Sequence, residues 1–144
     1  MKKTLIISAY DCCGKTYAFE HYQDEFSILD LFFNQKFSNN YLKYIRDNIG
    51  KVDIIFVDGS IKTRKYLTDA NIDFITVLPH DSCIHEWIGK YVEKYVSLNS
   101  FIIKDFIKST KEINQEPYGK NAYYLHHNEF MDREFLRQMI KLNC

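Results

Sequence analysis

The chain has few residues that break regular structure, no excess of one charge and no long hydrophobic run. Its 144 residues include only 5 glycines and 2 prolines, and we find no repeat, low-complexity tract or linker that would divide it. The 19 basic and 19 acidic residues balance to a net charge of zero, whereas domains that coat nucleic acid are normally strongly basic. This balance counts against a protein whose main partner is nucleic acid.

No stretch approaches the ~20 apolar residues that span a bilayer. The N-terminal "MKKTLIISAY" begins like a signal peptide, but its apolar run is short and meets Asp11 and Lys15 at once, which indicates a strand instead. We therefore expect a soluble, cytoplasmic protein without a membrane partner.

The four cysteines do not form the pattern of a disulfide framework. Cys12 and Cys13 are adjacent, and cytosolic thiols normally stay reduced. Cys83 lies between His80 and His85 in "HDSCIH", a grouping that raises the question of a metal. Because these three lack a second pair of ligands elsewhere, we favour a polar loop over structural zinc.

The chain contains five short runs of apolar residues that are typical of buried strands. Continuous apolar runs of this kind suit a parallel sheet covered on both faces. The predicted strands span 3–8, 26–31, 52–58, 72–79 and 121–127.

Helical patterns lie between these runs and after the last one. The alternation predicts a single α/β domain over residues 1–144, a three-layer αβα sandwich around a five-stranded parallel sheet with right-handed crossovers. The predicted helices lie within 14–23, 39–50, 61–71, 83–96, 100–114 and 131–143. We expect Gly50 to stop the second, Ser100 to cap the fifth, and the last to be capped near Asn128.

The stretch "SAYDCCGKTY" matches the pattern of a phosphate-binding loop, with the permitted alanine first. Such a loop must leave a strand and enter a helix, so that backbone N–H groups converge on the phosphates, and its flanks satisfy this requirement. Lys15 would reach the β- and γ-phosphates, and the Thr16 hydroxyl would hold Mg²⁺. The loop residues are Ala9, Tyr10, Asp11, Cys12, Cys13, Gly14, Lys15 and Thr16. Asp11 introduces a negative charge that would contact the magnesium shell or face away.

Two further aspartates end predicted strands. Asp58 follows four apolar residues in "DIIFVDGS", where a carboxylate would hold Mg²⁺ and orient the acceptor. Ligands of open α/β sheets bind at this carboxyl edge. The alternative for Asp58 is an ordinary helix cap. Asp30 ends "SILD" in the same way, and would either contact the acceptor or cap the next segment.

With this loop and strand end, the chain resembles nucleoside monophosphate kinases of the P-loop class. The stretch "IIFVDGSIKTRKYL" is similar to the adenylate kinase segment in which a strand ends in Asp-Gly and an arginine follows. The resemblance implies that Arg64 binds the acceptor phosphate, although the spacing is longer and the family's proline is missing. In element order the chain is most similar to small phage-encoded nucleotide kinase-like proteins.

In such relatives the segment after the fourth strand is a lid whose arginines clamp the phosphoryl group. Here a short helical lid at about 80–100 carries Lys90 and Lys94 and no arginine. Lysine supplies charge without the planar fork of guanidinium. Their spacing of four places both lysines on one helix face, so they could act as a pair. The alternative is that they form the solvated face of an amphipathic helix that packs through Trp87 and its neighbours.

The resulting hypothesis is an ATP- and Mg²⁺-dependent kinase acting on a nucleoside or deoxynucleoside monophosphate. Its predicted catalytic residues are Lys15, Asp58, Arg64, Lys90 and Lys94, with Asp30 and Arg64 on the acceptor. Two alternatives stay open, a polynucleotide 5′-kinase and a nucleotide-binding sensor with a degraded lid. A further cluster, Phe32, Phe33, Phe37 and Tyr41, would form either a base-stacking wall or, as we favour, core. The base, the sugar and the oligomeric state do not follow from the sequence.

Overall fold

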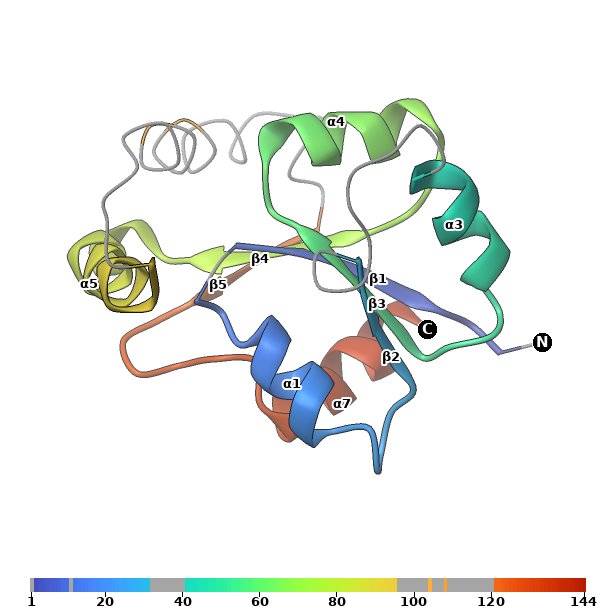
Figure 1. Cartoon of the computed structure of the whole chain (residues 1–144), viewed down its shortest axis with the longest axis horizontal. Coiled ribbons are helices and arrows are strands. Elements are labelled where there is room, and N and C mark those ends of the chain that lie inside the picture. The colour runs from blue at the N-terminus through green and yellow to red at the C-terminus, as the bar shows by residue number, and fades with distance from the viewer. Residues whose placement is uncertain (1, 11, 32–40, 96–103, 105–107, 109–120) are drawn as a thin grey trace.

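A five-stranded parallel sheet forms the centre of the computed structural model, which describes residues 2–10, 12–31, 41–95, 104, 108 and 121–144 (Figure 1). Its strands lie in the order β2-β3-β1-β4-β5, and every neighbouring pair is parallel. The strands are β1 (Leu5–Ala9), β2 (Ile28–Asp30), β3 (Ile54–Asp58), β4 (Ile75–Pro79) and β5 (Ala122–Leu125). All five strands predicted from apolar runs are therefore confirmed, each shorter than its run.

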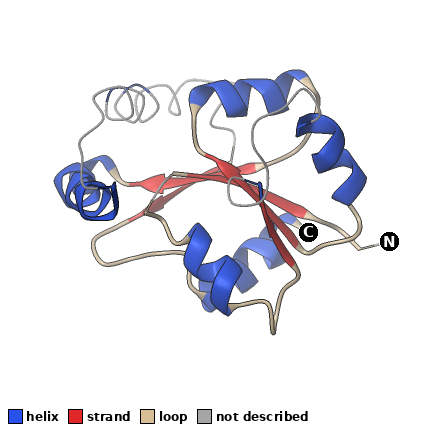
Figure 2. Ribbon diagram, in the orientation of Figure 1, coloured by secondary structure: helices blue, strands red, loops and turns tan. Residues whose placement is uncertain are grey.

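Helices cover both faces of this sheet (Figures 1 and 2). The helices α3 and α4 lie over one face, and α1 and α7 lie over the other. The helical elements are α1 (Lys15–His21), α3 (Tyr41–Asn48), α4 (Ile61–Asp69), the short 3₁₀ turn η1 (Asp81–Cys83), α5 (Ile84–Tyr95) and α7 (Arg133–Asn143). The predicted three-layer αβα architecture is confirmed. The helix expected at 100–114, with its Ser100 cap, lies outside the described residues except for 104 and 108.

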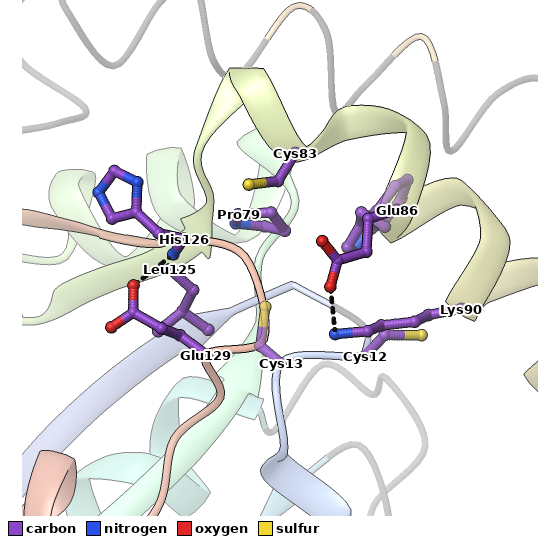
Figure 3. A pocket seen from close by; sticks show the side chains of 10 residues that line it. Cys12, Cys13, Pro79, Cys83, Glu86, Lys90, Leu125, His126 and Glu129 are labelled. Atoms are coloured by element: carbon purple, nitrogen blue, oxygen red, sulfur yellow. Dashed lines mark hydrogen bonds and ion pairs between the residues drawn. The ribbon is translucent and has the colours of Figure 1, made fainter.

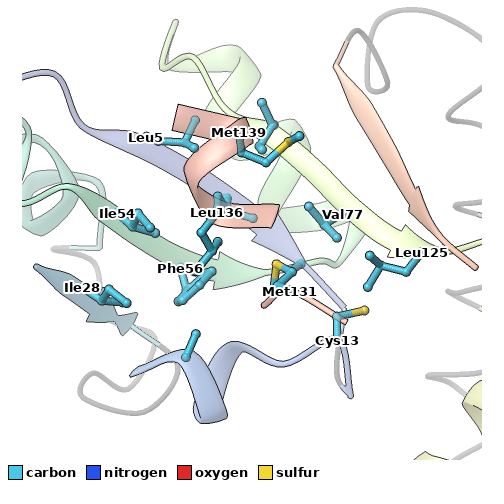
Figure 4. Packing of buried hydrophobic residues seen from close by; sticks show 14 of the residues in the cluster. Leu5, Cys13, Ile28, Ile54, Phe56, Val77, Leu125, Met131, Leu136 and Met139 are labelled. Atoms are coloured by element: carbon cyan, nitrogen blue, oxygen red, sulfur yellow. The ribbon is translucent and has the colours of Figure 1, made fainter. Parts of the chain in front are cut away.

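Alternate residues of the central strands supply the two halves of the core, because side chains along a strand point to opposite faces. Phe56 packs with Leu136 and Met139 of α7 (Figure 4). Ile7 of β1 and Ala18 of α1 belong to the same cluster. On the opposite face, one cluster joins central-strand side chains to those of α3 and α4. It includes Ile6, Ile55, Val57, Ile45 and Leu67.

The prediction that the last helix is capped near Asn128 is wrong. The N-cap of α7 is Asp132, whose side chain accepts a hydrogen bond from the Phe135 N–H at 2.8 Å. Asn128 instead has a φ of 61° in the turn that follows β5. A carboxylate at the N-cap satisfies a helix N–H group that has no partner within the helix. The prediction for Gly50 fits, since α3 ends at Asn48 and Gly50 has a φ of 89°.

Candidate functional site

The predicted phosphate loop joins the end of β1 directly to the start of α1. Gly14 precedes the helix with a φ of 105°, a backbone conformation that favours glycine. Among the described residues no side chain caps this helix, so its first N–H groups are donors that a phosphate group can use. Lys15 and Thr16 form the first turn of α1. The predicted loop residue Asp11 lies outside the described residues.

The remaining side chains of the loop differ in exposure. Lys15, Cys13 and Ala9 are all buried, with 7%, 1% and 0% of their surface exposed. Cys12 is partly exposed and has a φ of 65°. The Cys13 carbonyl accepts a hydrogen bond from the Met131 N–H at 3.0 Å. The segment after β5 therefore contacts the loop and holds its backbone in place.

Asp58 lies beside this loop, as predicted for an acidic residue on a strand adjacent to the first. The register pairs Ala9 with Asp58, so both strands end at the same level. The Asp58 carbonyl accepts a hydrogen bond from the Ser8 hydroxyl at 2.7 Å. Its Oδ1 accepts from the Ser60 N–H at 2.9 Å and from the Ser60 hydroxyl at 2.6 Å. Ser60, not Asp58, is the N-cap of α4, and Asp58 orients that cap.

Asp30 and Tyr41 form the buried side of the site, next to Asp58. Asp30 ends β2 and is 1% exposed, and Tyr41 is 6% exposed. Burial raises the pKa of the Tyr41 hydroxyl, and the negative charges of Asp58 and Asp30 raise this pKa further. The phenol therefore stays protonated beside two carboxylates. Tyr41 packs in the core with Ile45, as we favoured, while Phe32, Phe33 and Phe37 lie outside the described residues.

Arg64, the predicted acceptor-binding arginine, is buried with 0% of its surface exposed. Its Nε donates to the Gly59 carbonyl at 3.3 Å, and its Nη2 donates to the Tyr10 hydroxyl at 3.2 Å. The guanidinium thus lies between the phosphate loop and the turn after Asp58. Its predicted contact with an acceptor stays a prediction.

The helix α5 carries Lys90, whose Nζ lies 3.4 Å from a carboxylate oxygen of Glu86, one turn earlier. Glu86 also pairs with His127 Nδ1 and accepts from the Asn128 N–H at 3.3 Å. The hydrogen bond from His127 lowers the pKa of the Glu86 carboxyl, although burial opposes this effect. Lys90 therefore already has an acidic partner. The Lys94 side chain lies outside the described residues.

Sequence reasoning missed the role of Glu86 and of residues 126–132. The spacing of four between Glu86 and Lys90 was a usable signal, because such residues are neighbours on a helix. The contacts of Glu86 with His127 and Asn128, and of Met131 with the loop, join distant segments. They left no local signal in the sequence.

A pocket lies beside the loop, between α5 and the segment after β5 (Figure 3). It combines apolar walls, three thiols and several charged groups at the carboxyl edge of the sheet. Its lining residues are Cys12, Cys13, Pro79, Cys83, Glu86, Trp87, Lys90, Leu125, His126 and Glu129. No group of three potential metal ligands occurs within the described part of the chain, so the structure adds no support for zinc at His80, Cys83 and His85.

Comparison with known proteins supports the fold. The structure is similar to the crystal structure of a gluconokinase from Sinorhizobium meliloti 1021, with a TM-score of 0.53 and 10% sequence identity. The alignment covers 96% of this chain and 90% of that chain. At this identity the similarity shows the P-loop kinase-like fold alone. No protein-family model matches the chain, and no curated protein matches it in sequence.

Proposed function

We propose that this chain transfers the γ-phosphoryl group of ATP to a small-molecule acceptor, a nucleoside or deoxynucleoside monophosphate. The observation that carries the proposal is the register of Ala9 with Asp58, which brings the phosphate loop and a carboxylate to one edge of the sheet. Open α/β sheets bind their ligands at this edge.

The donor side of the proposal rests on residues 9–16. The backbone N–H groups at the start of α1 bind the phosphates, and Lys15 neutralises charge that develops during transfer. The Thr16 hydroxyl and the Asp58 carboxylate are hard oxygen donors, which is the ligand type that Mg²⁺ prefers. When bound, Mg²⁺ would neutralise phosphate charge, so these two side chains fit the metal that the reaction needs.

The acceptor side of the proposal rests on the resemblance to nucleoside monophosphate kinases and on the polar cluster at the ends of β2 and β3. Asp58 accepts a hydrogen bond from a hydroxyl group of the acceptor. Asp30, which is 1% exposed, does so only if the end of β2 opens toward the acceptor. Lys90, and Lys94 as predicted, supply the positive charge that arginines provide in related lids. This role requires Lys90 to exchange its 3.4 Å contact with Glu86 for a phosphate group.

The test is conversion of ATP to ADP with AMP, dAMP, dCMP, dGMP, dTMP and UMP in turn, with Mg²⁺ present. Gluconate belongs in the same panel, because the structural neighbour is a gluconokinase. A diphosphate product from one or two nucleotides would establish the proposed acceptor class. Phosphorylated gluconate instead would keep the phosphotransferase and replace its acceptor.

A nucleotide-binding sensor is the second candidate. The observation that favours it is that two predicted catalytic cations, Lys90 and Arg64, are respectively paired with a carboxylate and buried. Lys90 is paired with Glu86, and Arg64 has no exposed surface. Tight ATP binding without transfer to any acceptor in the panel would favour the sensor. A polynucleotide 5′ end is tested with a short single-stranded DNA in the same assay, although the zero net charge counts against it.

A further inference from the structure

A buried contact joins the phosphate loop to the turn that follows Asp58. Tyr10 lies in the loop and is 5% exposed, and Arg64 lies on α4 and is fully buried. The guanidinium donates to two acceptors from different elements, the Tyr10 hydroxyl at 3.2 Å and the Gly59 carbonyl at 3.3 Å. Arg64 therefore bridges the donor loop and the acidic strand end.

The two segments also touch through their backbones at Gly59. A Cβ atom at this position would lie 2.8 Å from the Tyr10 nitrogen, 2.9 Å from the Ala9 carbonyl carbon and 3.0 Å from Tyr10 Cγ. Real Cβ atoms essentially never approach backbone this closely. Only glycine fits without a shift, so the turn after Asp58 lies directly against the start of the loop.

The chemistry of arginine suits the task of holding these segments at a fixed separation. A guanidinium stays charged in proteins, and a buried charge is costly unless it is hydrogen-bonded. Because the guanidinium is planar and rigid, it also fixes the direction of each acceptor as well as its distance. Asp58 immediately precedes Gly59 and is itself held by the Ser60 N–H and hydroxyl. A shift of Gly59 would move the Asp58 carboxylate relative to the loop.

We propose that Arg64 and Tyr10 are positioning residues that align the phosphate loop with Asp58, and that Arg64 does not bind the acceptor. This inference rests on the proposed function. The alignment matters because Thr16 is on the loop side and Asp58 is on the strand side, and the proposed metal needs both. An acceptor contact would require the fully buried guanidinium to become accessible, whereas alignment requires it to stay between Tyr10 and Gly59.

The two roles predict different kinetic changes in the variants Tyr10→Phe and Arg64→Lys. Tyr10→Phe removes only the hydroxyl. It keeps the ring and its edge-to-face contact with Trp87, whose ring centroid lies 6.5 Å from that of Tyr10. Arg64→Lys keeps the charge and removes the planar fork. With an acceptor identified in the panel, we expect the Mg²⁺ concentration for half-maximal rate to rise about 3- to 10-fold in both variants. The KM for the acceptor stays within about twofold of the wild-type value.

Matched controls are Tyr66→Phe and Arg46→Lys. Tyr66 is on the same helix as Arg64 and is 46% exposed, and Arg46 is exposed and donates to the Ala70 carbonyl, away from the loop. Neither control changes the Mg²⁺ dependence if the effect belongs to the buried bridge.

Three outcomes overturn the inference, and they can be told apart. A raised acceptor KM with unchanged Mg²⁺ dependence makes Arg64 an acceptor ligand and leaves the proposed function in place. Wild-type values for both parameters in both variants show that the bridge does not align the site. Wild-type protein that transfers phosphate to no acceptor removes the proposed function, and the inference with it. If Arg64→Lys fails to fold, Tyr10→Phe alone decides between the first two.

Discussion

Lys15 is the side chain on which the proposed transfer most directly depends. We expect Lys15→Ala to lower turnover by at least about a hundredfold, because it removes the charge that stabilises the transferring phosphoryl group. The fold should persist, with an unchanged far-UV circular dichroism spectrum. Lys15→Met keeps the buried aliphatic stem and should be equally inactive, whereas Lys62→Ala, at an exposed position on α4, should be fully active. Turnover retained by both Lys15 variants would remove the loop from the mechanism.

Gly59 provides a test of the contact between the loop and the strand end that does not depend on activity. We expect Gly59→Ala to lower the free energy of unfolding by about 1–3 kcal/mol, because the added methyl group meets backbone atoms that cannot rotate aside. Gly89→Ala is the matched control, since a Cβ there has no neighbour within 4 Å and alanine favours the helix interior. Denaturant unfolding measures both. Equal stability of Gly59→Ala and wild type would mean that the two segments separate freely.

The residues of the site differ in how far the sequence predicts them. Asp58 was predicted beside the loop because an apolar run ends there, and the register with Ala9 confirms its place next to β1. The burial of Arg64 was not predicted. It depends on Tyr10 and Gly59, which meet only after β1 and β3 pair, and no local pattern marks such a contact. The chemical roles of all these side chains stay predictions.

At the scale of elements, α7 is attached to the segment after α1 by exposed ion pairs. Arg133 contacts Asp24 and Glu25, and Arg137 contacts Glu25. Arg137 also contacts Glu134 within α7 itself. A hydrogen bond from Arg137 lowers the pKa of the Glu25 carboxyl, although burial opposes this, and Arg133 lowers it further. Since charged Glu25 is favoured in the folded state, these contacts stabilise the fold at neutral pH.

The sign of this shift gives a pH dependence. Stabilisation from Glu25 is fully present above the ordinary glutamate pKa of 4.5 and is lost as the pH falls through the lowered folded value. We expect Arg137→Gln to lower the melting temperature by up to a few degrees at about pH 7 and to converge on wild type as the pH falls through the lowered folded pKa of Glu25. Lys141→Gln, on the same helix, is the control. A deficit of Arg137→Gln that persists at acid pH would assign the effect to packing.

The limits of elements were harder to predict than their existence. Asn128 and Asp132 are both residue types that cap helices, and we expected the cap near Asn128, which is wrong. In the structure Asn128 lies in a turn, and its backbone N–H donates a hydrogen bond to Glu86. Asp132 follows Met131, which is buried and donates to the Cys13 carbonyl of the loop. Tertiary contacts of the segment after β5 therefore choose where α7 begins.

At the scale of the whole molecule, alternation of apolar runs and helical patterns was enough to predict a parallel sheet covered on both faces. The strand order could not be predicted in this way. In the sheet β2 lies beyond β3, and β4 lies on the far side of β1. Chain order does not reveal these placements. The carboxyl ends of β1 and β3 nevertheless had to meet once the strands were parallel and adjacent. No helix among the described residues is long and apolar enough to cross a membrane.

Ligand binding at that edge should stabilise the entire domain, because a ligand that binds only the folded state shifts the unfolding equilibrium. At a Mg²⁺–ATP concentration about 100 times its Kd, the gain is about 2.7 kcal/mol, which corresponds to a rise of roughly 5–10 °C in melting temperature. We expect the rise to be smaller with ATP and a chelator, absent in Lys15→Ala, and insensitive to Mg²⁺ in Asp58→Asn. The measurement is differential scanning fluorimetry, with Asp69→Asn, at an exposed site on α4, as the control. A Mg²⁺-dependent rise that survives in Asp58→Asn would place the metal away from β3, and no rise in wild type would remove ATP as the donor.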